Sequence, residues 1–121
     1  MTLPGGFIKM EVVSHLVTIA PADLLAEIES GRAPVILDVR SRKEYESGHV
    51  PGALHVPFWL VRSTIPRLHL RPDTPLVVYC GHGPRAYMAG AALRRLGFHT
   101  IAYLAGHMTR WTREGLREER T

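Results

Sequence analysis

The segment 76-LVVYCGHGPR-85 runs from an unbroken apolar stretch directly into a turn rich in glycine and proline. A short apolar run with β-branched residues, bounded by turn residues, indicates a strand that is buried on both faces. Pro84 suits the first turn of a helix, where the N–H that proline lacks would have no partner in the helix anyway. The residues after it carry apolar side chains on one helical face and end at Gly97. The segment therefore predicts a buried strand that passes through a tight loop into a helix.

Further apolar runs of the same kind lie on both sides of this segment, and helical patterns separate them. We expect the other strands at 16–19, 34–39, 53–56 and 100–104. Helices are expected at 21–30, at 42–47 behind a Ser41/Glu44 capping box, over part of 58–68, at 84–96 and after 106. Because strands and helices alternate throughout, the chain predicts an α/β fold with a parallel sheet covered on both faces.

The length and composition of the chain limit the number of domains and the kinds of partner that it can have. The 121 residues suit one domain, predicted at 17–121 behind an N-terminal leader at 1–16 that frames the first strand or is mobile. A net charge of +4 is compatible with an anionic substrate or partner without identifying one. Arginines and glutamates alternate near the C-terminus, which argues against a nucleic-acid-binding arm. We see no signal peptide and no apolar run long enough to span a membrane.

Cys80 is the only cysteine of the chain. An internal disulfide is therefore impossible, and a reducing, cytoplasmic compartment is expected. A zinc site built on several cysteines is likewise excluded, and we expect no metal.

The position of Cys80 suggests chemistry. In open α/β sheets, ligand sites lie at the carboxyl ends of the strands, which is where Cys80 falls. Gly81 and Gly83 allow the loop to curl so that several backbone N–H groups converge, and the start of the next helix adds positive potential. The predicted binding loop comprises Gly81, His82, Gly83, Pro84, Arg85 and Ala86, of which all but Pro84 can donate an N–H. This setting favours a thiolate, so Cys80 is the predicted nucleophile, although a buried, inert cysteine is the alternative.

Three segments together resemble the rhodanese family. The run from Cys80 to Arg85 resembles the active-site loop of that family, which has the form Cys-x-x-Gly-x-Arg. An upstream signature matches at 37–40, 44–45, 48–53 and 55–57, and a closing segment matches at 104–106 with Trp111 and Gly115 behind it. Ala105 departs from the pattern, because a second glycine is common there. The resemblance spans roughly residues 17–115, nearly the whole chain.

The resemblance implies a fold and a reaction. The fold would be a three-layer α/β/α rhodanese-like domain with a five-stranded parallel sheet. Cys80 would take the outer sulfur of a donor such as thiosulfate, release sulfite and carry the sulfur as a persulfide. An acceptor such as cyanide, a thiol or a protein would then remove it. This is covalent catalysis by a transferase in two steps, with no cofactor, nucleic acid or membrane involved.

Several other polar residues have two interpretations. Asp38 and Arg40 follow the second expected strand, and they either shape the pocket or form a structural pair, which is the interpretation we favour. Arg42 either reaches an anion or is solvated, and His49 suits a hydrogen-bonded turn better than catalysis. Arg85 either steers the donor or pairs with a carboxylate and shapes the loop.

The aromatic residues behind the third expected strand carry a similar choice. Phe58 and Trp59 either wall the pocket or pack in the core, and core packing is the prediction for both. Trp111 is also predicted to lie in the core.

Two rival functions remain. Phosphatases and arsenate reductases also cradle an anion beside a cysteine, but they place five residues between the cysteine and the arginine. Only four lie between Cys80 and Arg85, which favours the smaller sulfur atom. The second rival is a persulfide carrier or interaction module within a larger sulfur pathway, and the sequence leaves it open.

Overall fold

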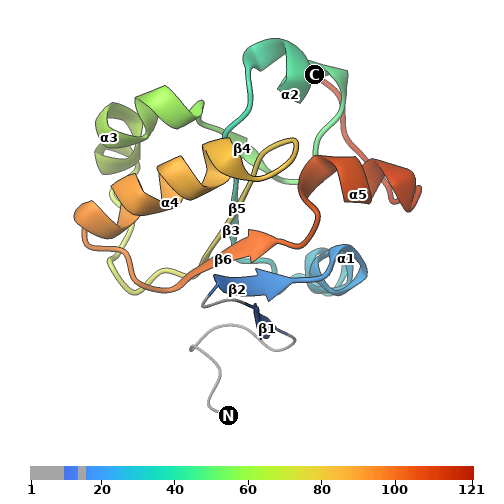
Figure 1. Ribbon diagram of the computed structural model, residues 1–121, viewed down its shortest axis with the longest axis horizontal. Coiled ribbons are helices and arrows are strands. Elements are labelled where there is room, and N and C mark those ends of the chain that lie inside the picture. Colours follow the sequence, from blue (N-terminus) through green and yellow to red (C-terminus); the bar gives the residue numbers. More distant parts are fainter. Residues whose placement is uncertain (1–9, 14–15) are drawn as a thin grey trace.

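The computed structural model describes residues 10–13 and 16–121, which form a sheet between two layers of helices (Figure 1). The strands are β1 (Glu11–Val13), β2 (Leu16–Ile19), β3 (Val35–Asp38), β4 (Leu54–His55), β5 (Leu76–Tyr79) and β6 (Ile101–Leu104). The α-helices are α1 (Pro21–Glu29), α2 (Arg42–Ser47), α3 (Val61–Thr64), α4 (Pro84–Arg95) and α5 (His107–Arg113). Two 3-10 turns, η1 (Phe58–Leu60) and η2 (Ile65–Leu68), flank α3.

The strands lie in the order β1-β2-β6-β5-β3-β4, with β5 in the middle of the sheet. The five strands predicted from the sequence are all present and parallel to one another, which confirms the α/β fold. A sixth strand, β1, pairs antiparallel with β2 at the edge. Its three residues are too few to show a strand pattern in the sequence. Of the predicted leader, residues 1–9 and 14–15 lie outside the described residues.

Alternate side chains of β5 point into two separate apolar cores. Leu76 and Val78 pack with Cys80 under α3 and α4. Val77 and Tyr79 pack on the other face, with residues of α1 and α5. Because successive side chains of a strand point to opposite faces, Cys80 continues the α4 side while its neighbour Tyr79 faces α5.

The helix ends carry the predicted signals. The Ser41 hydroxyl accepts the N–H of Glu44 while the Glu44 carboxylate accepts the N–H of Ser41, so the capping box is confirmed. Pro84 lies in the first turn of α4, as predicted. Within residues 10–13 and 16–121, every helix is too short or too polar to cross a bilayer.

One glycine in α4 is required by packing rather than by backbone conformation. A Cβ at Gly90 would collide with the phenol of Tyr103 on β6, so the helix lies against the sheet at this point. We predict that Gly90→Ala lowers the free energy of unfolding by about 1–3 kcal/mol because of overpacking. In an ordinary helix interior the same change would stabilise the protein by about 1 kcal/mol.

Urea unfolding of Gly90→Ala tests this prediction. Ala91→Gly is the matched control, because Ala91 is exposed one position further along α4 and should follow helix propensity alone. A Gly90→Ala variant more stable than the unmodified protein would contradict the close packing.

Candidate active site

Cys80 follows β5 at the carboxyl edge of the sheet, and its side chain is buried (0 % exposed). Its Sγ accepts a hydrogen bond of 2.9 Å from the backbone N–H of Gly83. Its own N–H donates to Nδ1 of His107, and its carbonyl accepts the N–H of Met108 at 3.0 Å. Cys80 is thus held between the start of α4, through its sulfur, and the start of α5, through its backbone.

The loop after Cys80 needs glycine at position 83. Gly83 has φ +138°, a conformation that residues with a side chain rarely adopt. A Cβ there would also lie 3.0 Å from the ring of Tyr87. Of the five N–H donors predicted for the loop, Gly83 is the one that reaches the thiol within the described residues.

Arg85 connects this loop to α2. Its guanidinium makes two hydrogen bonds to the Glu44 carboxylate, at 2.7 and 3.0 Å. This bidentate contact, helped by the donors of Ser41, lowers the pKa of Glu44 to about 2. Glu44, together with a smaller effect of the nearby Cys80, raises the pKa of Arg85. The contact supports the interpretation that Arg85 shapes the loop.

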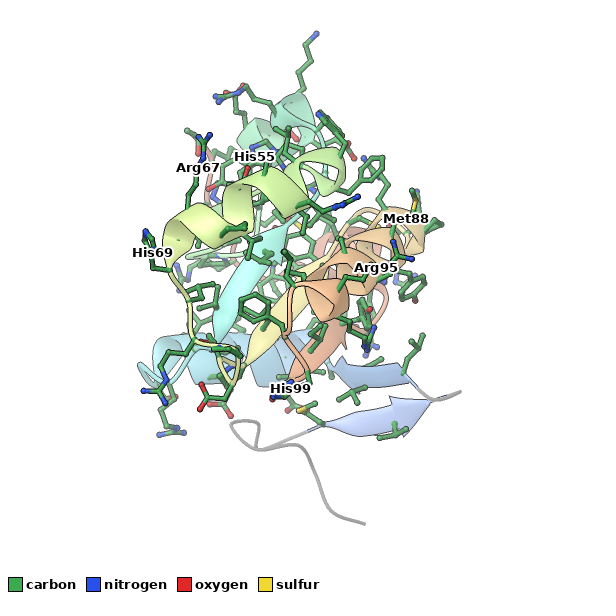
Figure 2. The ribbon with its side chains drawn as sticks, turned by 90° about the vertical axis from the view of Figure 1, so that its left-hand side faces the viewer. His55, Arg67, His69, Met88, Arg95 and His99 are labelled. Carbon is green, nitrogen blue, oxygen red and sulfur yellow. The ribbon has the colours of Figure 1, made fainter. Side chains whose placement is uncertain are left out.

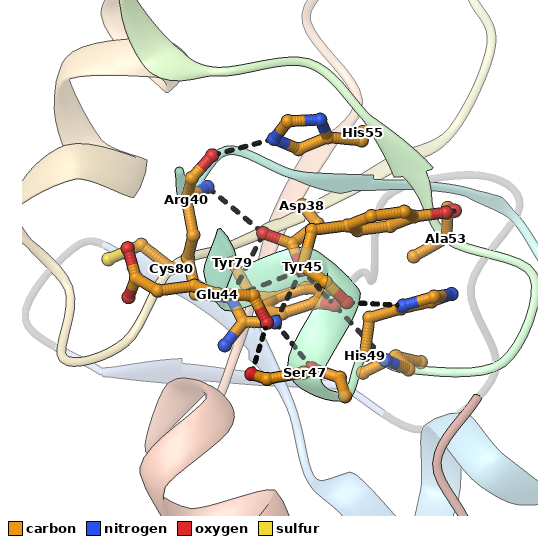
Figure 3. A network of polar contacts seen from close by, with 12 residues as sticks. Asp38, Arg40, Glu44, Tyr45, Ser47, His49, Ala53, His55, Tyr79 and Cys80 are labelled. Carbon is orange, nitrogen blue, oxygen red and sulfur yellow. Dashed lines mark hydrogen bonds and ion pairs between the residues drawn. The ribbon is translucent and has the colours of Figure 1, made fainter. Parts of the chain in front are cut away.

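Asp38 and Arg40 form a buried pair beneath the site, drawn in Figure 3. The Asp38 carboxylate accepts the Arg40 side chain at 2.8–3.1 Å and the backbone N–H of Arg40 at 2.9 Å. The Tyr79 hydroxyl donates to Asp38 at 2.7 Å, and burial raises the pKa of that hydroxyl. The geometry supports the structural interpretation of Asp38 and Arg40. Sequence reasoning missed Tyr79, whose place before the cysteine in a buried strand was the available signal.

The remaining predicted polar residues, His49 and Arg42, lie away from Cys80. His49 is buried, stacks on Tyr45 and lies within 2.8 Å of the Tyr45 carbonyl through Nδ1. It lies across the network from Cys80 in Figure 3. Arg42 has a largely exposed side chain that pairs with Glu46 at 3.3 Å. Neither residue contacts the thiol.

The aromatic predictions had mixed outcomes. Trp111 is fully buried, as predicted. Phe58 is partly buried against the core that contains Cys80. The prediction that Trp59 packs in the core is wrong, since its side chain is 61 % exposed. Trp59 is the middle residue of η1, whose tight turn leaves it on the solvent side.

His107 is a site residue that the sequence analysis missed. It is buried at the start of α5 with φ +54°, and its Nδ1 accepts the N–H of Cys80 at 3.2 Å. Burial, with a smaller contribution from His82, lowers the pKa of His107 to about 4. The imidazole is therefore neutral near pH 7 and can act as an acceptor. Its position just after β6, the neighbour of β5, was the signal that places it beside Cys80.

An open pocket lies over the loop, with a volume of about 370 Å³. Its lining consists of Arg40, Glu44, Gly81, His82, Met108, Thr109 and Thr112. The Thr109 hydroxyl donates to the Gly81 carbonyl at 3.0 Å and so ties α5 to the loop. Across the described part of the chain, no three His, Cys, Asp or Glu side chains gather in a way that would hold a metal ion.

We predict that His107 makes stability depend on pH between about 6.5 and 4. Its pKa is about 4 in the folded protein and 6.5 ordinarily, so in this window the unfolded chain binds a proton that the folded chain does not. Stability should therefore fall as the pH falls through this window. His107→Asn should remove this component, because asparagine tolerates positive φ and its carbonyl can still accept the Cys80 N–H.

Urea unfolding at a series of pH values measures the difference between the two proteins. His99→Asn is the control, because His99 is exposed outside the site. Equal slopes for the unmodified protein and His107→Asn would contradict the prediction.

Comparison with known proteins assigns this chain to a family. The Rhodanese-like domain family matches residues 20–114. A sulfurtransferase of Allochromatium vinosum is 34% identical over 85 residues, which cover 68% of this chain and 75% of that protein. A probable adenylyltransferase/sulfurtransferase, MoeZ, of Mycobacterium tuberculosis is 33% identical over 97 residues, 80% of this chain. The chain spans only about 25% of the length of that relative.

A solved structure agrees with the fold. A rhodanese-related protein from Thermoplasma volcanium superimposes with a TM-score of 0.72 at 29% identity, over 86% of this chain and 98% of that one. The family match at residues 20–114 contains β5, Cys80, the loop after it and α4. The chain belongs to the rhodanese-like domain family and is a sulfurtransferase-like protein.

Proposed function

We propose that this protein moves a sulfane sulfur from thiosulfate, or a related small anionic donor, to a thiophilic acceptor through a persulfide on Cys80. The observation that carries the proposal is the Gly83 N–H held 2.9 Å from the Cys80 sulfur at the start of α4. A backbone donor and a helix N-terminus at a sulfur favour its anionic form, which is the nucleophile. The chain has one cysteine and is similar to sulfurtransferases, and both facts favour Cys80 as the residue that carries the sulfur.

The first step forms the persulfide. The Cys80 thiolate attacks the outer sulfur of thiosulfate, a new S–S bond forms, and the old S–S bond breaks. The electron pair of the broken bond leaves with sulfite, and the negative charge moves to the outer sulfur of the persulfide. The loop N–H groups and the α4 N-terminus are suited to stabilise that charge. Arg85, held by Glu44, keeps the loop closed around the sulfur.

The second step transfers the outer sulfur of the Cys80 persulfide to the acceptor. A thiolate or cyanide attacks the outer sulfur, the persulfide S–S bond breaks, and the electron pair returns to Cys80. A cytoplasmic setting, where thiols stay reduced, suits this step. A persulfide carrier within a larger sulfur pathway is the second candidate, supported by the match to only part of the mycobacterial relative. The two candidates share the Cys80 persulfide and differ in the acceptor.

We predict that incubation with thiosulfate adds the mass of one sulfur atom to the protein, and that a reductant removes it. Cys80→Ser should show no such gain and should lose transfer from thiosulfate to cyanide completely, because no other cysteine is present. Intact-mass spectrometry and a thiocyanate assay measure the two quantities. Hydrolysis of an aryl phosphate without release of sulfite would overturn the proposal in favour of a phosphatase.

We also predict that Arg85→Gln and Glu44→Gln lower kcat/KM for thiosulfate by similar factors, on the order of tenfold to a hundredfold, because each removes the bidentate contact that positions the loop. Steady-state kinetics of both variants test this. Arg113→Gln is the control, since Arg113 is exposed on α5. If Arg85→Gln alone raised KM while Glu44→Gln kept the KM of the unmodified protein, Arg85 would instead bind the sulfur donor directly.

A further inference from the structure

Large apolar side chains and arginines are exposed on α3, on the 3-10 turns η1 and η2 that flank it, and on α4. We call this surface the α3–α4 face, and its members are Trp59, Leu60, Arg62, Arg67, Met88 and Arg95, all of them exposed. The two helices contact each other and lie side by side toward the viewer in Figure 2, where Arg67, Met88 and Arg95 are labelled. Met88 alone is 59 % exposed, close to the 61 % of Trp59. Apolar side chains of this size exposed together mark interaction surfaces.

The face carries positive charge that nothing on it neutralises. Residues 48–72 and 74–113 contain no aspartate or glutamate, and the lone Asp73 between them lies 3.3 Å from Arg71. Arg62, Arg67 and Arg95 make no ion pair with any carboxylate among residues 10–13 and 16–121. The other carboxylates of the chain lie on β1, α1, β3, α2 and the C-terminal segment. A partner of this face is therefore expected to be acidic.

The face is too long to serve a small donor. Arg95 lies eleven residues after Pro84 on α4, which at 1.5 Å per residue puts the two roughly 16 Å apart. An anion the size of thiosulfate at the Cys80 loop cannot touch Arg95. Met88, by contrast, lies four residues after Pro84, about one turn along α4, so the face begins about one turn from the loop and leads away from it. This arrangement suits a macromolecule whose reacting end reaches Cys80.

The composition of the face favours a protein over a nucleic acid. Tryptophan, methionine and arginine are enriched at protein–protein interfaces, where they supply most of the binding energy. A surface that follows a phosphate backbone needs a denser row of cations than three arginines around apolar side chains. Cys80 is also fully buried, so the partner must offer its reacting group on a narrow, extended segment.

We propose that the α3–α4 face is the docking surface for an acidic protein that receives the Cys80 sulfur on a cysteine thiol. The proposal rests on the persulfide chemistry above and adds the acceptor. The acceptor thiolate attacks the outer sulfur of the Cys80 persulfide, the new S–S bond forms on the acceptor, and the electron pair of the broken bond returns to Cys80. No oxidant or reductant is consumed.

Two synthetic peptides serve as probes. One carries several glutamates, two leucines and a single terminal cysteine, and its twin has lysine in place of glutamate. The full-length protein is first loaded with thiosulfate, and intact mass confirms the persulfide. Transfer of sulfur to each peptide thiol is then followed at low and at high salt, with 2-mercaptoethanol as a small neutral acceptor.

We expect the acidic peptide to accept sulfur about tenfold faster than its lysine twin at low salt, with the advantage shrinking as salt rises. The triple variant Arg62→Gln, Arg67→Gln, Arg95→Gln should lose most of that advantage and keep its rate with 2-mercaptoethanol. The matched control is Arg32→Gln, Arg113→Gln, Arg120→Gln, which removes the same charge from exposed positions elsewhere and should change the rate less than twofold. Trp59→Ser should also slow the transfer of sulfur to the acidic peptide.

Other outcomes would overturn the proposal. Equal rates for the two peptides, or equal losses in the two triple variants, would show that the face does not recognise acidic acceptors. Tighter binding of single-stranded RNA than of the acidic peptide to the unloaded protein, measured by fluorescence anisotropy, would assign the face to nucleic acid. The same anisotropy measurement separates docking from chemistry, because a protein that forms no persulfide yet binds the acidic peptide refutes the proposed function and keeps the docking surface.

Discussion

The buried Asp38 carboxylate is the constraint on which the rest of the site depends. It lies at the end of β3 and accepts hydrogen bonds from the Arg40 side chain, the Arg40 backbone and the Tyr79 hydroxyl. Arg40 donates onward to the Gly48 carbonyl at 2.7 Å, and the Val50 N–H donates to the Tyr79 hydroxyl at 3.1 Å. Removing one partner of a buried pair leaves an uncompensated charge, at a cost of about 3–5 kcal/mol. The network therefore holds the ends of β3 and β5 and the turn after α2 in one arrangement.

That arrangement sets the geometry above it. With the end of β5 fixed, Cys80 leaves the sheet in one direction, and the loop has to close within the few residues before α4. Gly83 closes it by its positive φ, and the Arg85–Glu44 contact ties the closed loop to α2. His107 and Thr109 complete the enclosure from α5, one through the Cys80 N–H and the other through the Gly81 carbonyl. The sulfur is thus positioned by three helices and by the end of one strand.

Local sequence patterns predicted most of the fold. The five parallel strands, the Ser41 capping box and the start of α4 at Pro84 all follow from short-range rules, because each depends on a few neighbouring residues. What the sequence could not show depends on contacts across the sheet. His107 lies next to Cys80 only because β6 pairs with β5. Trp59 is exposed because, within the tight turn η1, it is the neighbouring Phe58 that packs against the core. The partner of Arg85 was equally hidden, since Glu44 is far away in the chain and near only in the fold.

Successive side chains of β5 alternate between the two faces of the sheet, and this alternation limits how the site can change. Tyr79 points into the layer of α1 and α5, whereas Cys80 points under α4. Shifting the strand by a single residue would exchange the two sides, so the hydroxyl would lose Asp38 and the thiol would lose its loop. An insertion or deletion in this strand would therefore disrupt both contacts at once, whereas a substitution at one position of β5 acts first on the core that its side chain faces. Tyr79 and Cys80 thus serve different layers of the fold, and both depend on the same register of β5.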